Sequence, residues 1–221
     1  MALIFIGGIG FFVWGDLKEH KLHIRKYALH TKIVLITSLL LIIGPSILFL
    51  ILERHALFAD MNTPQAILNA LFCAVTPRTA GFNTTDIASL SQSSQLLTII
   101  LMFIGGCPGS TAGGAKVTTI TVLILYLRSM LTRTDGVNIF KRRLEDEAVS
   151  KAAAVFTTHM LLAVAATFLI SMQQDLDLTV IVFDVVSAVS TVGMSTGITP
   201  HLVPGAKVIL ILLMYLGRVG S

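Results

Sequence analysis

The stretch TPRTAGFNTTD, residues 76–86, is polar and centred on Gly81, yet apolar sequence lies on both sides of it. The apolar run before it, residues 64–75, makes a helix of only about 18 Å at 1.5 Å per residue, which can enter a bilayer but cannot cross it. Irregular backbone at membrane depth is tolerated only where it is buried in protein or lines a water-filled cavity. We therefore interpret residues 64–86 as a short helix and a loop that dip into a membrane. A re-entrant turn that only packs is the simpler alternative.

The composition indicates a membrane protein. Of the 221 residues, 54% are hydrophobic and 13% are charged, and the mean hydropathy is +0.85. A soluble domain has about 25% charged residues, so soluble folding around one large core is the disfavoured alternative. The basic residues behind the net charge of +4 gather in two connections between apolar runs, at 16–32 and 128–151. The positive-inside rule places both connections in the cytoplasm, and this distribution is unlike a basic arm that binds nucleic acid.

The chain repeats one unit, which consists of a spanning run, a short apolar helix, a glycine-containing loop and a second span. Residues 33–52 and 152–171 are long enough to cross a bilayer, and residues 178–190 form a second short helix. We expect an all-α integral membrane protein built from tandem repeats of this unit. The expected segments are the end of a preceding helix (1–15), a cytoplasmic basic loop (16–32), a repeat whose second span is broken (33–127), another cytoplasmic basic loop (128–151) and a final, truncated repeat (152–221).

Both short helices end in the same motif. The run Thr79-Ala80-Gly81-Phe82-Asn83-Thr84 matches Thr191-Val192-Gly193-Met194-Ser195-Thr196 as T-x-G-apolar-[N/S]-T, and Pro77 and Arg78 are an insertion in the first copy. A short helix that enters from outside directs its partly negative C-terminal end toward the bilayer centre. Rings of backbone carbonyls replace the hydration shell of an alkali cation, and glycine permits the backbone geometry that such a ring requires. The candidate ligands are therefore the backbone carbonyls of Thr79, Ala80, Gly81 and Phe82 and of Thr191, Val192, Gly193 and Met194.

Glycine also interrupts the span at residues 96–127, in the stretch FIGGCPGSTAGGAK. This interruption cannot hold a continuous helix, and we expect a movable gate there, with a static packing kink as the alternative. The candidate gate residues are Gly105, Gly106, Pro108, Gly109, Ser110, Thr111, Gly113 and Gly114. Residues 109–116 nearly spell a phosphate-binding loop, but Ala115 separates the last glycine from Lys116 and no Ser or Thr follows the lysine. We therefore reject nucleotide binding.

Several polar side chains lie within apolar runs. Arg218, about 22 Å into the final span, needs a partner or a water-filled pore at that depth. Asp184, in the second short helix, is a candidate ion ligand, although a hydrogen-bonded brace for the loop is the preferred interpretation. His159 is expected to pack between helices. Cys73 and Cys107 lack the spacing of metal ligands and are expected to be small buried residues.

The motifs TPRTAGFNTTD, FIGGCPGSTAGGAK and STVGMSTGITP, with the terminal GRVG, resemble those of the Trk/Ktr/HKT superfamily of cation transporters, most of all a bacterial Ktr-type potassium-uptake subunit. The resemblance implies four span–pore helix–span repeats around one pore, of which this chain is the third and fourth. Gly81 and Gly193 then take the filter-glycine positions, residues 105–114 form the intramembrane gating loop, and Arg218 is the arginine that faces the pore. Ser221 stands where the family usually has proline.

The resemblance also implies the partners and the ion. The expected partners are the missing N-terminal repeats of the same subunit, a second copy in a homodimer, a cytoplasmic nucleotide-binding regulatory subunit and the lipid of the cell inner membrane. K⁺, with Na⁺ as a further transported or coupling ion, is the only cofactor expected. The chain is not expected to be an enzyme, because it lacks paired carboxylates, a nucleophile–base set and a metal cluster. The alternatives to K⁺ uptake are a plain K⁺ or Na⁺ channel and a membrane scaffold that does not conduct.

Overall fold

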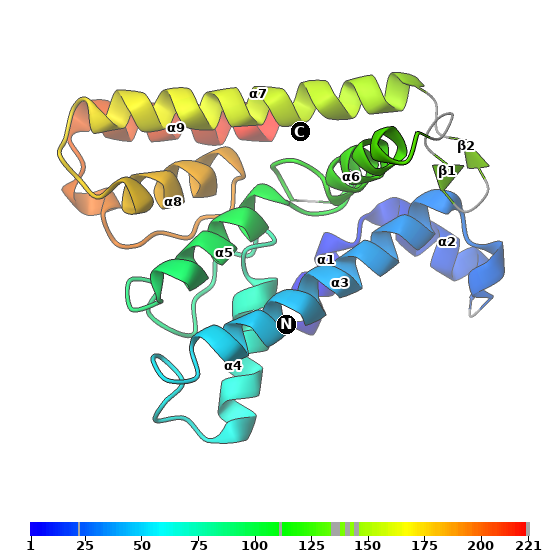
Figure 1. Cartoon of the computed structure of the whole chain (residues 1–221), viewed down its shortest axis with the longest axis horizontal. Coiled ribbons are helices and arrows are strands. Elements are labelled where there is room, and N and C mark those ends of the chain that lie inside the picture. The colour runs from blue at the N-terminus through cyan, green and yellow to red at the C-terminus, as the bar shows by residue number, and fades with distance from the viewer. Residues whose placement is uncertain (22, 111, 134–137, 140–141, 144–145, 220–221) are drawn as a thin grey trace.

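The computed structural model of the chain describes all residues except 22, 111, 134–137, 140–141, 144–145 and 220–221. The described residues are largely helical (Figure 1). The helices are α1 (Ala2–Gly8), α2 (Phe11–His20), α3 (Leu29–Leu52), α4 (Thr63–Val75), α5 (Gln92–Phe103), α6 (Val117–Leu131), α7 (Asp146–Ser171), α8 (Leu178–Val189) and α9 (Pro204–Val219), with 3₁₀ turns at Ile24–Lys26 and Thr199–His201. Two short antiparallel strands, β1 (Asn138–Ile139) and β2 (Arg142–Arg143), pair Asn138 with Arg143 and Ile139 with Arg142.

Two helices, α3 and α7, have the length and composition of membrane spans in the described part of the chain. Their apolar side chains are mostly directed away from the rest of the chain, as shown by the exposure of Leu40 on α3 and of Leu161 and Phe168 on α7. Such exposure is unfavourable in water and favourable against lipid. Pro45 lies inside α3 without ending it, and the neighbouring Ser46 hydroxyl donates a hydrogen bond of 2.6 Å to the Ile42 carbonyl.

The helices extend further into the basic connections than we predicted from hydropathy. Helix α2 continues to His20, although the first basic loop was expected to begin at residue 16, and α7 begins at Asp146 instead of residue 152. The added turns carry ion pairs between residues four apart, including one of 2.7 Å between Glu147 and Lys151. Hydropathy detects only the apolar centre of a span, whereas helical hydrogen bonding continues into a charged flank that side-chain pairs support.

The two short helices differ in how far the rest of the chain surrounds them. Helix α8 lies among α5, α7 and α9 (Figure 1), and buried residues on several of its faces, including Ile181, Phe183 and Val189, belong to the largest apolar cluster. Helix α4 packs against α3 and α5 through a second cluster that contains Phe49 and Ala74. These contacts bury α8 over most of its length, whereas α4 is buried only in its C-terminal part, at Ala70 and Cys73 to Val75.

A buried carboxylate joins the end of α3 to the start of α5. Glu53, which is 0% exposed, accepts hydrogen bonds of 3.0 Å from the Ser91 backbone N–H and 2.6 Å from its hydroxyl. Ser91 is also the N-cap of α5 and accepts a bond from the Ser94 backbone N–H. Burial by itself would raise the pKa of the Glu53 carboxyl, but the hydrogen bonds from Ser91, Ser94 and Leu57 together hold that pKa below its ordinary value.

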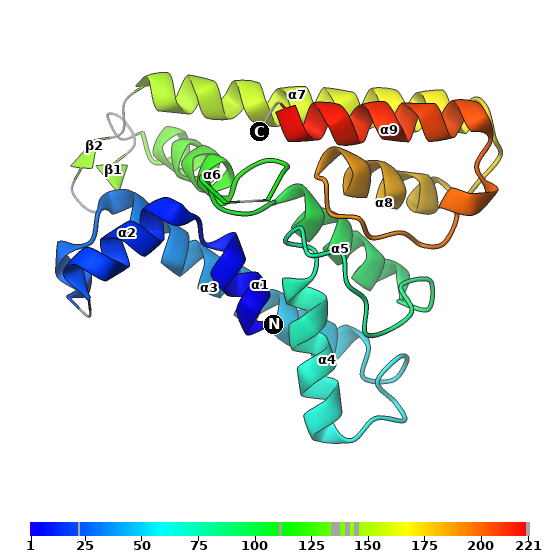
Figure 2. The same cartoon turned by 180° about the vertical axis from the view of Figure 1, so that it is seen from behind.

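Helices α5 and α6 are separated by residues 104–116, which we call the break (Figure 2). The helix ends at Phe103, and α6 begins at Val117 after two pairs of glycines and a proline. The predicted interruption of this span is therefore present.

Candidate functional site

The two T-x-G motifs form loops with positive φ angles at matching positions. Loop 1 (residues 76–84) follows α4, and loop 2 (residues 190–197) follows α8. The φ angles are +63° at Thr79 and +70° at Gly81 in loop 1, and +53° at Thr191 and +87° at Gly193 in loop 2. A positive φ at threonine is rare and costs about 1–2 kcal/mol, so its occurrence at matching positions shows that the sequence repeat is also a structural repeat.

The two loops touch one another. A Cβ atom added to Gly81 would lie 2.5 Å from the Val192 carbonyl oxygen, a distance that only the absence of a side chain permits. A Cβ at Gly193 would meet no atom within 4 Å in the described chain. Two motifs that are 112 positions apart in the sequence are thus brought together. Gly81 lies at the contact between the two loops, whereas Gly193 faces away from it into open space.

Each loop is held by a different set of hydrogen bonds. In loop 1 the Thr76 hydroxyl donates to the Phe82 carbonyl, so one lone pair of this predicted ligand is used within the loop. The Ala80 backbone N–H donates to the Thr76 carbonyl over 3.1 Å. In loop 2 the Val192 backbone N–H donates to the Ser187 carbonyl over 2.9 Å, which ties the loop to the last turn of α8. Ala80, Val192 and Met194 are predicted to bind the cation through their backbone carbonyls, and their apolar side chains take no part in that binding.

Asp184 braces loop 2, as we preferred from the sequence. Its carboxylate is 5% exposed and accepts bonds of 2.9 Å from the Ser195 and Thr199 hydroxyls and of 3.2 Å from the Thr196 backbone N–H. A buried carboxylate that is satisfied by three residues of one segment fixes the path of that segment. Ala74-Val75-Thr76 and Ala188-Val189-Ser190 occupy equivalent places at the ends of the two short helices. This alignment sets Ala70 opposite Asp184, so α4 has no carboxylate at the equivalent position.

The described residues of the break form a loop that closes on itself. The Gly105 backbone N–H donates to the Ala115 carbonyl over 2.8 Å, and the Val117 backbone N–H donates to the Gly106 carbonyl over 3.0 Å. Within it, the Ser110 hydroxyl donates to the Cys107 carbonyl over 2.6 Å. The break is also tied to the N-terminal helices, because the Cys107 N–H donates to the Gly8 carbonyl over 3.2 Å and the Phe11 N–H donates to the Gly109 carbonyl over 3.0 Å. Thr111 lies outside the described residues.

The break packs directly against loop 2. A Cβ at Gly113 would overlap the Thr191 hydroxyl, and one at Gly114 would lie 3.1 Å from the Ser190 side chain. The last helix also approaches closely, since Gly217 lies against the Val189 carbonyl at the end of α8. The candidate gate, one candidate filter loop and the C-terminal part of α9 therefore form one contact region.

Sequence reasoning missed Lys116. Its ammonium donates a hydrogen bond to the Ala112 carbonyl across the break. Arg218, on α9, is an exposed side chain that lies close enough to Lys116 for the two positive charges to interact. A lysine that follows a glycine-rich interruption of a span was the available signal, but we considered it only as part of a phosphate-binding motif.

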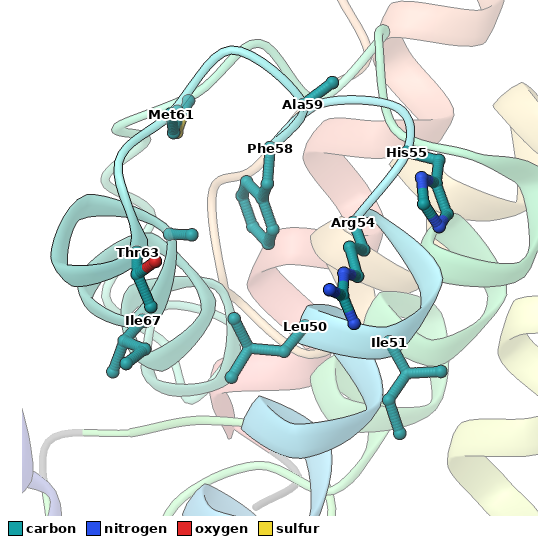
Figure 3. A pocket seen from close by; sticks show the side chains of 10 residues that line it. Leu50, Ile51, Arg54, His55, Phe58, Ala59, Met61, Thr63 and Ile67 are labelled. Carbon is teal, nitrogen blue, oxygen red and sulfur yellow. The ribbon is translucent and has the colours of Figure 1, made fainter.

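The cavity at the C-terminal end of α3 is separate from this region. It has a volume of about 730 Å³ and lies between the last turn of α3, the turn after it and the start of α4 (Figure 3). Arg54 and His55 lie on one side of it, and Thr63 and Ile67 lie on α4 opposite them. Its lining includes no residue of loop 1, loop 2 or the break, so it does not form part of the predicted ion path.

Two helices of spanning length, each followed by a short helix and a loop with positive φ angles, fit a helical membrane protein. The family model described as "TrkH: Cation transport protein" matches residues 1–221, and the chain belongs to this family. It is a family of transport proteins and not of enzymes. The predicted Trk/Ktr resemblance is thereby confirmed.

The relatives agree with this assignment. The potassium/sodium uptake protein NtpJ of Enterococcus hirae is 40% identical over 99% of this chain, and the Ktr system potassium uptake protein B of Bacillus subtilis is 34% identical over 99%. The crystal structure of the potassium transporter TrkH from Vibrio parahaemolyticus superposes with a TM-score of 0.80 at 22% identity, over 99% of this chain and 48% of that one. The chain covers 49% of each of the two sequence relatives, and so spans about half the length of the curated relatives it matches.

Proposed function

We propose that this chain is the C-terminal half of a subunit that takes up K⁺ across the cell membrane, with Na⁺ as a second candidate ion. The observation that carries the proposal is the contact, at Gly81 and Val192, of two T-x-G loops that have positive φ angles at matching positions. The names of the relatives, which are potassium or potassium/sodium uptake proteins, support the choice of ion.

The loop geometry suits a cation filter. A backbone that alternates between left-handed and right-handed residues gathers its N–H groups on one side, which leaves the carbonyl oxygens on the other. Thr79 and Gly81, and likewise Thr191 and Gly193, flank a residue whose φ is not positive. Carbonyl oxygens lined up in this way replace the water around a desolvated cation. The partly negative ends of α4 and α8 lie immediately before the loops and add to the attraction.

Two loops make only part of a ring. The open side of Gly193 is where the loops of the first two repeats complete the filter in the proposed subunit. A cation that loses its hydration shell and meets ligands on only one side of the pore faces a large desolvation cost. The complete four-repeat subunit is therefore the conducting unit.

The break serves as the gate in this proposal. It lies against loop 2 and carries Lys116, while Arg218 lies near that lysine on α9. Two positive charges beneath a cation filter oppose the passage of a cation, and movement of the break relieves this barrier. A static kink is the alternative, and it predicts that shortening the break changes folding and not the rate of transport.

Charge and family membership support the proposed orientation and partners. The basic connections at 16–32 and 128–151 favour an orientation with the starts of α3 and α7 on the cytoplasmic side of a multi-pass inner-membrane protein. A second copy and a cytoplasmic nucleotide-binding regulatory subunit complete the assembly, in keeping with relatives that are named as parts of a Ktr system.

The test is K⁺ uptake by a bacterial strain without its own K⁺ uptake systems. The complete subunit that contains these two repeats is expected to restore growth at low K⁺, and replacement of Gly81 by Ser is expected to weaken the preference for K⁺ over Na⁺. The purified 221-residue chain alone is expected to give no K⁺-selective flux in liposomes. An unchanged ion preference in the Gly81 variant, or selective flux through the chain alone, would reject the proposal.

A further inference from the structure

A buried arginine connects loop 1 to the break. Arg78 is 8% exposed, and its Nη2 donates a bond of 3.0 Å to the Ser38 hydroxyl on α3 and lies 3.8 Å from the Cys107 sulfur in the break. Ser38 and Cys107 are both 0% exposed and are 3.6 Å apart. Three elements that are distant in the sequence therefore meet at one guanidinium.

This guanidinium has few other interactions. No ion pair joins Arg78 to a carboxylate among the described residues, and its Nε has no hydrogen-bond partner there. Burying a charge is costly unless it is paired or hydrogen-bonded. Ser38 and Cys107 therefore carry much of the stabilisation of this charge within the chain, and displacement of either leaves it poorly satisfied.

The position of Arg78 makes its contacts matter for loop 1. It precedes Thr79, the residue with a φ of +63°, and its own backbone N–H donates to the Val75 carbonyl over 3.2 Å. Arg78 belongs to the two-residue insertion that loop 2 lacks. Loop 2 instead contacts the break directly, through Gly113 against Thr191. Near its start, the break contacts the Arg78 side chain of loop 1 through Cys107. Near its end, the backbone of the break at Gly113 lies against Thr191 of loop 2.

We propose that Arg78 is a positioning residue that couples the loop 1 carbonyls to the break through Ser38 and Cys107. Movement of Cys107 removes one partner of the buried guanidinium, which shifts the Arg78 side chain and the strained backbone next to it. Opening of the gate and ion preference are then linked, although Cys107 contributes no ligand to the filter. This inference rests on the proposed filter and gate and adds the connection between them.

The experiment measures both the K⁺ uptake rate and the preference for K⁺ over Na⁺ in the complete subunit. Cys107→Ala is expected to lower the preference by about three- to tenfold, the effect of losing one ordinary hydrogen bond, because a 3.8 Å contact to sulfur is weaker than a usual bond to a charged group. Cys107→Ser, which keeps a small polar acceptor, is expected to restore most of the preference. The matched control is Cys73→Ala, which removes the other buried cysteine, on α4, with its Sγ 3.9 Å from the Thr85 hydroxyl, and is expected to leave the preference unchanged.

A double variant separates coupling from simple damage. When Arg78→Met is already present, Cys107→Ala is expected to cause no further loss of preference, because contacting residues are not additive. If Cys107→Ala does not reach the membrane, Ser38→Ala is the second test. It removes the other hydrogen-bond partner of Arg78, which lies on α3 and belongs to neither loop 1 nor the break, and it is expected to lower the preference similarly.

The failure of this inference differs from the failure of the proposed filter. A preference that stays at the wild-type value in Cys107→Ala and Ser38→Ala, while Gly81→Ser lowers it, would overturn the coupling and leave the filter in place. Additive losses in the double variant would also overturn the coupling. If Gly81→Ser has no effect either, the filter assignment itself is wrong.

Discussion

Replacement of Gly81 by alanine, compared with the same change at Gly193, tests which glycine shapes the ion ligands. Both residues have a positive φ, +70° and +87°, so alanine at either position costs about 1–2 kcal/mol of backbone strain. The two differ in their surroundings. The added Cβ at Gly81 would lie 2.5 Å from the Val192 carbonyl oxygen, whereas at Gly193 it would meet nothing within 4 Å.

The steric part of the effect can be estimated from this distance. Ordinary contact of a Cβ begins at 3.4 Å, so Gly81→Ala requires the Val192 carbonyl and loop 1 to separate by about 0.9 Å. Cation ligands in proteins are held within about 0.2 Å of their preferred distances. The shift is several times this tolerance and affects a predicted ligand directly. We therefore expect Gly81→Ala to lower the preference for K⁺ over Na⁺ by about tenfold or more, and Gly193→Ala to lower it less.

The assay is the uptake of K⁺ in competition with Na⁺ by cells that carry the complete subunit, with the amount of subunit in the membrane measured for each variant. If both variants reach the membrane in equal amounts, a folding defect does not explain a difference in their preference for K⁺ over Na⁺. Equal loss of preference in the two variants would refute the reasoning from the Val192 contact. A normal preference in Gly81→Ala at a normal membrane level would refute the assignment of loop 1 to the filter.

Three further outcomes are expected. Asp184→Ala leaves the buried donors of loop 2 without their acceptor, at about 1–3 kcal/mol for each, so ion competition assays should show a larger loss of K⁺ preference than in Asp184→Asn, which keeps one carbonyl oxygen. The lowered pKa of Glu53 contributes stability that is present above the ordinary carboxyl pKa of about 4 and is lost as the pH falls through the folded-state pKa. Thermal unfolding in detergent should therefore show a loss of stability in acid for the wild type and a smaller loss for Glu53→Gln. Removal of residues 110–112, or Arg218→Gln, should raise the K⁺ uptake rate of the complete subunit and weaken its regulation, whereas unchanged kinetics in both would favour a static kink.

Much of the fold was predictable because membrane segments reveal themselves locally. Runs of about 20 apolar residues marked α3 and α7, and shorter runs marked α4 and α8, since the bilayer imposes length and hydropathy on each segment separately. The start of α4 was expected at residue 64 and lies one residue earlier, at Thr63. The ends of α2 and the start of α7 were missed because charged helical turns look like loop on a hydropathy scale.

The candidate site was predicted in part. The repeated T-x-G motif identified both loops, and the prediction that Asp184 is a brace was confirmed by its bonds to Ser195 and Thr199. The role of Lys116 as a donor across the break was missed, because the carbonyl that it binds becomes available only in the folded break. Arg78 was recognised as an insertion, and nothing in the sequence indicated its partners.

The sequence by itself determined the class of protein, the repeated unit and the position of the glycine loops, because hydropathy, glycine content and motif spacing act through neighbouring residues and the bilayer. Only the tertiary structure decided that Gly81 touches Val192, that Gly113 touches Thr191 and that Arg78 reaches Cys107. These contacts join residues between 29 and 111 positions apart, and no local pattern specifies them. They form because the two short helices bring their C-terminal ends to one region. The packing there is close, so only residues of a suitable size, such as a glycine, fit at each contact.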